Sequence, residues 1–376
     1  MRIVHVSDCF PPRTGGIESQ VSDLAAQQAL AGHEVHVLTA TLGAHGERGG
    51  VVEHARGVQV HRLGTRLPFD LPVNPVQARL LRAELDTLQP DVVHVHAGVV
   101  SPFAFDGARL AVARGVPTAI TWHCMLDGMV PPLRAAVRAT SWRSTPAALS
   151  AVSRAAAQRV GTVFDAQVEV VPNGMDLEAW APSASGGVRA EGSPVHLVAT
   201  MRLAPRKRAV PLVALVAAAA RRLPAGALRL TVIGDGPTRR GVEQAVASHG
   251  LQAVVHLTGR LSREEVRAAY ADADVFLAPA ELEAFGIAAL EARTAGLAIV
   301  ARSGTGIEEF VVDGTDGLLV ADDAEMTEAI VHLVRDQRLL AGICAHNRAV
   351  RPAFSWDRVL RAAESEYRRA GALAGR

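Results

Sequence analysis

The sequence has very little lysine, asparagine or cysteine. Only one of its 39 basic residues is a lysine, Lys207, and asparagine occurs three times. A codon bias toward GC-rich codons, which encode arginine and alanine, explains this scarcity. The three cysteines, Cys9, Cys124 and Cys344, are far apart and have no C-x-x-C spacing, which excludes a disulfide framework and a zinc knuckle. Against this background, the place of the single lysine is informative.

The sequence also lacks a strong charge imbalance and a long hydrophobic run. Its 39 basic and 38 acidic residues give a net charge of +1, which argues against a broad nucleic-acid-binding or polybasic membrane surface. The longest apolar run, residues 209–220, is far shorter than the ~20 residues needed to cross a bilayer and predicts a core helix. The N-terminal residues turn polar too soon for a signal peptide. We therefore expect a cytoplasmic protein that binds no nucleic acid.

Short β-branched segments alternate with alanine-, leucine- and arginine-rich segments along the chain. The predicted strands are 3–6, 35–39, 92–96, 118–121, 168–171, 195–199, 229–233, 254–257, 275–277 and 298–300. This alternation predicts an α/β fold with parallel sheets covered by helices on both faces. Residues 181–194, which are small and without periodicity, predict a linker between two doubly wound domains that face a cleft. Ligands of such sheets bind at the carboxyl ends of the strands.

Two loops that follow predicted strands have compositions suited to a phosphate. Gly15 and Gly16 begin a helix, where the backbone can approach an anion and the helix N-terminus favours negative charge; an ordinary tight turn explains them equally well. Arg202 and Lys207 follow strand 195–199, and a compact ammonium and a planar guanidinium are not interchangeable on a phosphate. The alternative is that the only lysine of the sequence lies in this loop by chance. Neither the loop with Gly15 and Gly16 nor residues 234–239 carries a G-x-G-x-x-G fingerprint.

A pair of glutamates follows the strand at 275–277. The pattern predicts a helix that begins near Phe285 and Gly286, with Glu283 just before it and Glu291 about two turns inside it. Free N–H groups at such a helix start lie beside Glu283. A carboxylate together with several amides can hold hydroxyls and a phosphate at once, as a nucleotide sugar requires. Helix capping for Glu283 and a solvated helix face for Glu291 are the alternatives.

Glu283-x7-Glu291, in the context P-A-x-x-E-A-F-G-I-A-A-L-E-A, resembles the signature of the retaining glycosyltransferases of family 4, the group 1 glycosyl transferases with the GT-B fold. Other motifs agree with this family in order and spacing: Pro11-Pro12…Gly15-Gly16-x-Glu18, Gly32-His33-x-Val35, Pro90-Asp91-Val92-Val93-His94-x-His96, Val171-Pro172-Asn173-Gly174-x-Asp176, Arg202…Lys207, Gly234-Asp235-Gly236-Pro237 and Asp313-Gly314-x-x-Gly317-x-Leu319-Val320. The similarity covers nearly the whole chain. It implies an acceptor-side Rossmann-like domain at 1–180, a donor-binding Rossmann-like domain at 195–352, and a helix at 353–376 that crosses back to the first domain.

The resemblance implies a role for each matching residue. Arg202 and Lys207 bind the donor diphosphate and neutralise the leaving group. Glu291 accepts hydrogen bonds from the ribose, and Glu283 holds hydroxyls of the transferred sugar with the help of backbone amides. Those amides belong to Phe285, Gly286 and Ile287. One departure from the family pattern is Arg208, which stands where a small residue, often glycine, is common.

In the first domain the resemblance implies that Gly15 and Gly16 approach the diphosphate when the cleft closes. It further implies that His123, in Thr121-Trp122-His123-Cys124, is the active-site histidine that faces the donor sugar; without the family, a lone histidine is usually structural. With Arg202, Lys207 and Glu283, His123 completes the set of catalytic residues that we expect.

The implied reaction is the transfer of a hexose-type sugar, with retention, from a UDP- or GDP-sugar to a hydroxyl of a glycan, a glycolipid or a small natural product. We expect no cofactor, no essential metal and no protein nucleophile. Asp272-Ala273-Asp274 lies at the entry of a strand, so we interpret it as a helix-to-strand junction, and His94-x-His96 has no apparent third zinc ligand. The alternatives are a nucleotide-sugar epimerase of the same fold and a non-catalytic nucleotide-sugar-binding protein.

The segments 40–75 and 124–146 are the parts that we expect to face the acceptor. Arg134, Arg138, Trp142 and Arg143 give the second a basic, partly apolar helix, which suits an anionic acceptor or peripheral contact with the inner face of a membrane. A solvated face of an arginine-rich protein is the favoured alternative. We expect a monomer or a homodimer.

Overall fold

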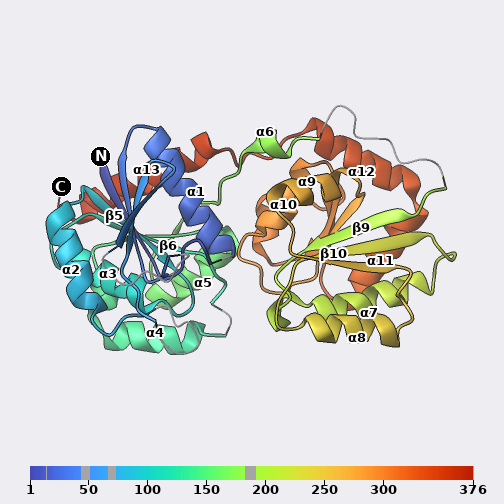
Figure 1. The fold of residues 1–376 in the computed structure, drawn as a ribbon, viewed down its shortest axis with the longest axis horizontal. Coiled ribbons are helices and arrows are strands. Elements are labelled where there is room, and N and C mark those ends of the chain that lie inside the picture. The colour runs from blue at the N-terminus through green and yellow to red at the C-terminus, as the bar shows by residue number, and fades with distance from the viewer. Residues whose placement is uncertain (14, 44–50, 67–72, 127, 183–191, 376) are drawn as a thin grey trace. The chain divides into compact units, whose positions relative to one another are not determined.

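The computed structural model of the protein describes residues 1–13, 15–43, 51–66, 73–126, 128–182 and 192–375 (Figure 1). The chain forms two compact units, Met1–Gly174 together with Phe354–Arg376, and Met175–Ala353. Most of the predicted linker at 181–194 lies outside the described residues. Each unit has its own parallel sheet with helices on both faces, which confirms the predicted α/β fold class with two doubly wound sheets. No helix in the described part of the chain is long and apolar enough to cross a membrane.

The sheet of the first unit has the strand order β3-β4-β2-β1-β5-β6-β7-β8. Its neighbouring strands are parallel apart from β3 and β4, which form an antiparallel hairpin. The bounds are β1 Arg2–Ser7, β2 Glu34–Thr39, β3 Val51–Ala55, β4 Val58–Arg62, β5 Val92–Ala97, β6 Thr118–Trp122, β7 Ala148–Ala151 and β8 Glu169–Val170.

Helices cover both faces of this first sheet. Figure 1 shows α1 (Gly16–Leu30) and α13 (Trp356–Leu373) on one face, and α2 (Gln77–Leu88), α3 (Pro102–Val112), α4 (Val130–Ala139) and α5 (Arg154–Phe164) on the other. The chain leaves β1 toward β2 on one side and returns to β5 on the other, so the strand order reverses between β1 and β5. That reversal is where doubly wound sheets bind ligands.

The last helix, α13, packs as an integral part of the first unit. Its Tyr367 and two alanines join an apolar cluster with residues of β1, β5, β6 and β7. At its start, the ring of Trp356 lies so close to Gly174 that a Cβ there would come within 2.5 Å of the ring. Gln20 on α1 binds both the N–H (3.0 Å) and the C=O (3.1 Å) of Gly174. The V-P-N-G segment is therefore held from two sides, and the glycine is required for the close approach of the indole.

The sheet of the second unit is parallel throughout and has the order β11-β10-β9-β12-β13-β14. Its strands are β9 Val195–Thr200, β10 Leu228–Ile233, β11 Val255–Gly259, β12 Val275–Ala278, β13 Ala298–Arg302 and β14 Gly317–Val320. Helices α7 (Ala209–Ala220), α8 (Arg239–Ser248) and α11 (Asp323–Arg335) lie on one face, and α9 (Arg263–Ala271), α10 (Ile287–Thr294) and α12 (Gln337–Ala349) on the other (Figure 1). The strand order reverses between β9 and β12.

Burial explains why these segments form strands and core helices. Both faces of the central strands are covered, so they consist of nearly continuous apolar runs such as Val195–Ala199, which is fully buried. The apolar run at 209–220 is the core helix α7, as predicted.

The predicted strands agree with the observed ones to within two residues at each end, and the strand predicted at 168–171 is the two-residue β8. Strands β3, β4, β7 and β14 have no counterpart among the predictions. The β7 sequence, Ala-Leu-Ser-Ala, contains no β-branched residue, and β14 begins with glycine. β7 and β14 are strands because they pair with the buried strands β6 and β13, and not because of local propensity.

Candidate functional site

Two loops of the second unit meet at the point where its strand order reverses. The loop after β9 carries Arg202 and Lys207, and the loop after β12 carries Glu283 and leads into α10. Because β9 and β12 are parallel neighbours, their carboxyl ends lie side by side. This is the edge at which an open α/β sheet binds its ligand. The structure thus brings together the sequence-predicted residues of the second domain.

Lys207 and Glu283 are in direct contact. The Lys207 Nζ donates to Glu283 Oε2, and both side chains are about one-fifth exposed, so the pair faces solvent at the loop edge. Arg202 is exposed on the same loop. The ammonium beside a carboxylate, with a guanidinium on the same loop and a helix N-terminus after Glu283, could bind a diphosphate and sugar hydroxyls.

The residue after the lysine, Arg208, adopts a left-handed backbone conformation with φ of 60°. Such a conformation favours glycine, which explains why the family often has a small residue here. In this chain the Arg208 side chain forms ion pairs. Its guanidinium binds both carboxylate oxygens of Asp323, at 2.8 and 2.6 Å, and it binds Glu281 at 2.7 Å. Asp323 also pairs with Arg302. The departure at position 208 therefore ties the lysine loop to α11.

Two glycines support the loop that carries Arg202. At Gly234, which has φ of +134°, a Cβ would lie 1.9 Å from the carbonyl oxygen of Met201, and at Gly236 it would lie 2.4 Å from that of Leu203. Leu203 in turn donates its N–H to Asp235 at 3.0 Å. The G-D-G-P segment thus packs backbone to backbone against the Arg202 loop. The sequence pattern marks this segment only as a failed dinucleotide fingerprint and as a family motif.

Helix α10 begins one residue later than predicted. Gly286 precedes it with φ of +88°, and Ile287 is its first residue. Glu291 consequently lies little more than one turn inside the helix, not the two turns predicted. Glu291 raises the pKa of the neighbouring buried Tyr270, for which burial is the larger cause. The Phe285 side chain is buried and packs against Phe310 at a ring distance of 5.5 Å, so only its backbone is available for a ligand.

Replacement of Gly286 by alanine tests this helix start. A Cβ at Gly286 would lie 2.6 Å from Ile307 Cγ1, in addition to the cost of a left-handed alanine. We expect a loss of about 2 kcal/mol in the free energy of unfolding of the second unit, together with weaker nucleotide-sugar binding. Gly304→Ala is the matched control, because Gly304 has φ of +70° but open space around it. Equal urea-unfolding midpoints for the two variants would contradict the contact with Ile307.

In the first unit, the predicted glycines lie at the reversal between β1 and β5. Gly15 and Gly16 are exposed, and Gly16 is the first residue of α1, as expected. The loop before them is held by Arg62, a buried residue of β4. Its guanidinium donates to the carbonyl oxygen of Pro11 at 2.7 Å and lies 5.6 Å from the centre of the Phe10 ring.

His123 follows β6, at a different strand end from the two glycines. Its backbone N–H binds Ala97 at 2.9 Å, and its Nε2 lies 3.0 Å from Nδ1 of His96. Burial lowers the pKa of His123 and of His5 to about 4, and it holds the pKa values of His94 and His96 well below the usual range. These four imidazoles are therefore neutral at pH 7.

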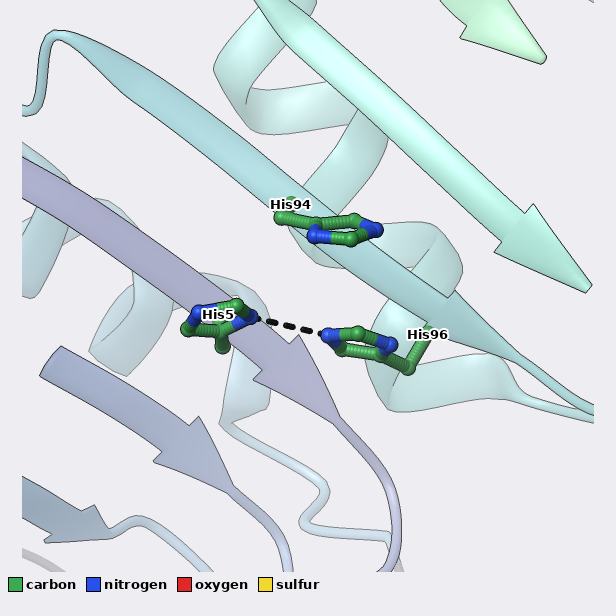
Figure 2. Close-up of side chains that lie close together, drawn as sticks. All are labelled: His5, His94 and His96. Carbon is green, nitrogen blue, oxygen red and sulfur yellow. Dashed lines mark hydrogen bonds between the residues drawn. The ribbon is translucent and has the colours of Figure 1, made fainter. Parts of the chain in front are cut away.

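The structure supplies a third imidazole beside His94-x-His96 that the sequence did not suggest. Figure 2 shows His5, from β1, beside His94 and His96 on β5. One ring nitrogen of each residue lies within 4.8 Å of the corresponding nitrogens of the other two. The spacing in the sequence showed no third ligand, whereas the structure brings His5 close to this pair. However, both nitrogens of every ring take part in hydrogen bonds to protein groups. A cation would have to break several of them, so the donor set fits a hydrogen-bond network better than a metal.

Two further predictions concern segments outside this cluster. Asp272-Ala273-Asp274 is a helix-to-strand junction, as expected: Asp274 accepts the N–H of His196 at 2.8 Å at the amino end of the sheet. The basic segment 134–143 is not one helix, because α4 ends at Ala139 and a separate turn covers Ser141–Ser144. In that turn, Trp142 packs against Phe105 at a ring distance of 5.8 Å.

Known proteins are similar to this chain over most of its length. Residues 14–179 match the family described as Glycosyltransferase Family 4, and residues 194–336 match Glycosyl transferases group 1. The chain is 30% identical, over all of its length and 97% of the relative, to the GDP-mannose-dependent alpha-(1-6)-phosphatidylinositol dimannoside mannosyltransferase of Mycobacterium tuberculosis. It is 28% identical to the D-inositol 3-phosphate glycosyltransferase of Nocardia farcinica, over 94% of the chain and 85% of the relative.

Among solved structures, the Anabaena protein HepE in complex with UDP-glucose superposes with a TM-score of 0.75. It shares 20% sequence identity, and the match covers 97% of this chain and 99% of that one. At this level of identity the likeness shows the fold alone, and it agrees with the GT-B architecture.

Proposed function

Because the chain belongs to the glycosyltransferases of family 4 and group 1, we propose that it transfers a hexose, with retention of the anomeric configuration, from a GDP- or UDP-linked donor to a hydroxyl acceptor. The observation that carries this proposal is the contact between Lys207 and Glu283 at the strand reversal of the second sheet. This contact supports the proposal, because an ammonium is suited to bind a diphosphate and a neighbouring carboxylate is suited to bind sugar hydroxyls. Mannose from GDP-mannose is the first donor to test, because the 30% identical relative is named for it.

In the proposed reaction, the bond between the anomeric carbon and the donor phosphate breaks while the acceptor oxygen attacks from the same face. The acceptor proton passes to the leaving phosphate. Arg202 and Lys207 stabilise the negative charge that develops on the diphosphate. Glu283 and the amides of residues 285–287 orient the sugar, and Glu291 binds the ribose. We also assign Gly15 and Gly16 to donor binding. We assign no residue as a nucleophile.

We propose that the reaction needs no metal. Arg202 and Lys207 supply the positive charge that a cation provides in metal-dependent transferases. The D-x-D segment gives no support for a metal, because Asp274 is engaged with His196 at the opposite end of the strand. Transfer should therefore persist in EDTA.

A donor screen followed by a transfer assay tests the proposal. Binding to the native state raises the unfolding temperature by mass action, so GDP-mannose, UDP-glucose and UDP-N-acetylglucosamine can be ranked with ADP- and dTDP-sugars as controls. The best donor, with its sugar radiolabelled, is then incubated with phosphatidylinositol, its mannosides and simple glycosides. We expect transfer of label with an alpha linkage, with and without EDTA. Beta-linked product would contradict retention.

The same assay separates the two rival functions. A nucleotide-sugar epimerase converts the donor to a sugar epimer with no acceptor present, and such a product would overturn the transferase proposal. A non-catalytic binding protein gives a thermal shift but neither hydrolysis nor transfer across the acceptor panel.

A further inference from the structure

A continuous chain of hydrogen bonds runs through the first unit, on the sheet face that α1 and α13 cover. It links β1, β5, β6 and β7 to both helices with distances between 2.7 and 3.3 Å. Its members, in order, are His123, His96, His5, Gln28, Tyr367, His94, Thr121, Ser150 and the carbonyl oxygen of Ile120. All of the side chains except that of His123 are buried. A buried chain of this length has to give every contact a donor and an acceptor.

The direction of donation follows from the end at Ile120. A carbonyl oxygen only accepts, so the Ser150 hydroxyl donates to it at 3.3 Å. Thr121 must then donate to Ser150, at 2.8 Å, which leaves the Thr121 oxygen to accept from Nε2–H of His94, also at 2.8 Å. A neutral imidazole donates through one nitrogen and accepts through the other.

The same rule carries the direction from His94 to Gln28. His94 accepts at Nδ1 from the Tyr367 hydroxyl, at 2.9 Å. The Tyr367 oxygen accepts in turn from the amide nitrogen of Gln28 at 2.8 Å. The amide oxygen of Gln28 therefore faces His5, and it accepts from Nε2–H of that ring at 2.7 Å.

Beyond Gln28 the direction passes along three imidazoles. His5, protonated at Nε2, accepts at Nδ1 from Nε2–H of His96, at 2.9 Å. His96 then accepts at Nδ1 from Nε2–H of His123, at 3.0 Å. Among the described residues, no hydrogen bond engages Nδ1 of His123. That nitrogen is left with a lone pair.

The opposite direction cannot satisfy the whole chain. If the Gln28 amide were turned over, every ring would carry its proton on Nδ1, and the Thr121 hydroxyl would donate to His94. Ser150 would then have one hydrogen for two contacts, to Thr121 and to Ile120. One contact at 2.8 or 3.3 Å would have no hydrogen. Because amide ends and tautomers follow from the network as a whole, only the first direction accounts for every distance.

We propose that Gln28 is a positioning residue that sets the tautomer of His123, so that Nε2 of His123 carries the proton and Nδ1 presents a lone pair to a hydroxyl of the bound sugar. The tautomer is a property of the protein alone. The identity of the hydroxyl rests on the proposed function. Tyr367, on α13, belongs to the same network, because its hydroxyl joins Gln28 to His94. The tautomers therefore also depend on a helix that is far from His123 in sequence.

The tautomers can be read directly by NMR. Two-bond proton–nitrogen spectra of the full-length protein, labelled with nitrogen-15 in histidine, distinguish the protonated nitrogen of each ring from the bare one at pH 7. We expect Nε2–H in all four rings, His5, His94, His96 and His123, assigned by single substitutions to glutamine. Nδ1–H in His123, or different tautomers among the four rings, would overturn the proposal. So would stoichiometric zinc that His5→Gln removes.

Variants at Gln28 separate tautomer control from simple packing. Gln28→Leu removes the acceptor for His5 and should produce both tautomers at His123, whereas Gln28→Glu keeps an acceptor and should restore Nε2–H. Gln27→Leu, the same change at a partly buried neighbour on α1, is the control and should leave the spectrum unchanged. A single Nε2–H form in Gln28→Leu would contradict the role of Gln28. If Gln28→Leu does not fold, the wild-type spectrum still tests the predicted tautomers of the four rings.

The transfer assay supplies an independent reading. Loss of one oriented hydrogen bond to the sugar should lower kcat/KM of Gln28→Leu about tenfold, with Gln28→Glu nearer the wild type and Gln27→Leu unchanged. If the expected tautomers are found but no variant affects transfer, the network stands and the placement of His123 at the sugar fails.

Discussion

Replacement of Lys207 by alanine is expected to lower kcat about a thousandfold while the chain stays folded. Lys207, the only lysine of the sequence, lies in the loop after β9 and contacts Glu283 at the strand reversal of the second sheet. Loss of a group that stabilises charge only as it develops lowers kcat by a factor of about 10² to 10³. In the proposed reaction, the largest charge change is on the diphosphate.

The fold should tolerate this change, because Lys207 is partly exposed. An ion pair that faces solvent contributes at most about 1 kcal/mol to the free energy of unfolding. Arg206→Ala is the matched control: Arg206 is the preceding residue and is exposed. Steady-state kinetics, with the unfolding temperature measured in parallel, check the prediction. Comparable kcat values for the Lys207 and Arg206 variants would remove Lys207 from the mechanism.

A steep loss of stability below pH 6.5 is expected for the first unit. Burial lowers the pKa of His5 and His123 from 6.5 to about 4, and it also holds the pKa values of His94 and His96 well below 6.5. These rings stay neutral in the folded state but take up protons on unfolding, so their stabilisation is fully present above pH 6.5. It is lost as the pH falls from 6.5 toward 4. For His5 alone, the shift corresponds to about 3 kcal/mol.

Two carboxyl groups of the same unit oppose this trend. Burial raises the pKa of Asp8 to about 6, even though Asp8 accepts the N–H groups of Phe103 and Ala104, and burial also raises the pKa of Glu366. The folded state therefore binds these protons before the unfolded state does, which reduces the net slope. Four imidazoles act against these two carboxyl groups, so we expect acid to lower the free energy of unfolding of the first unit.

Urea unfolding at pH 7.0, 6.0 and 5.0 checks this expectation. Fluorescence of Trp122, which is buried against Phe164 at a ring distance of 5.1 Å, reports on the first unit. His5→Gln should flatten the pH dependence, whereas His54→Gln, at an exposed position of β3, should not. A urea-unfolding midpoint that stays constant from pH 7.0 to 5.0 would show that these imidazoles do not remain neutral in the folded state.

The sequence was sufficient for the fold class and for the loops that carry the candidate site. Apolar runs bounded by turn residues predict buried strands, and the residues just after them lie by necessity at the carboxyl edge of the sheet. For that reason Arg202, Lys207 and Glu283 could be grouped before any coordinates were known. The hairpin of β3 and β4 could not be predicted, because its turn, Arg56-Gly57, holds a non-glycine residue in the left-handed region and lacks the usual Asn-Gly or Asp-Gly signal.

The features that were missed depend on contacts between distant segments. His5 meets His94 because β1 and β5 pair in a register that aligns these two residues, which are 89 positions apart. Likewise, the glycines at 234 and 236 matter because β10 ends beside the Arg202 loop. A single sequence indicates the strands but not their register, so it cannot show which side chains meet across the sheet.

The position of α13 in the first unit has a consequence for the order of synthesis. Residues 175–353 are continuous, so the second unit has its whole sequence as soon as it leaves the ribosome. The first unit is different: Tyr367 and the alanines that cover the sheet beside it are made after the whole second unit. The N-terminal strands must therefore wait, with one face incompletely covered, through the synthesis of an entire further unit. The hydrogen-bond chain through His94 and Gln28 closes only after Tyr367 has been made.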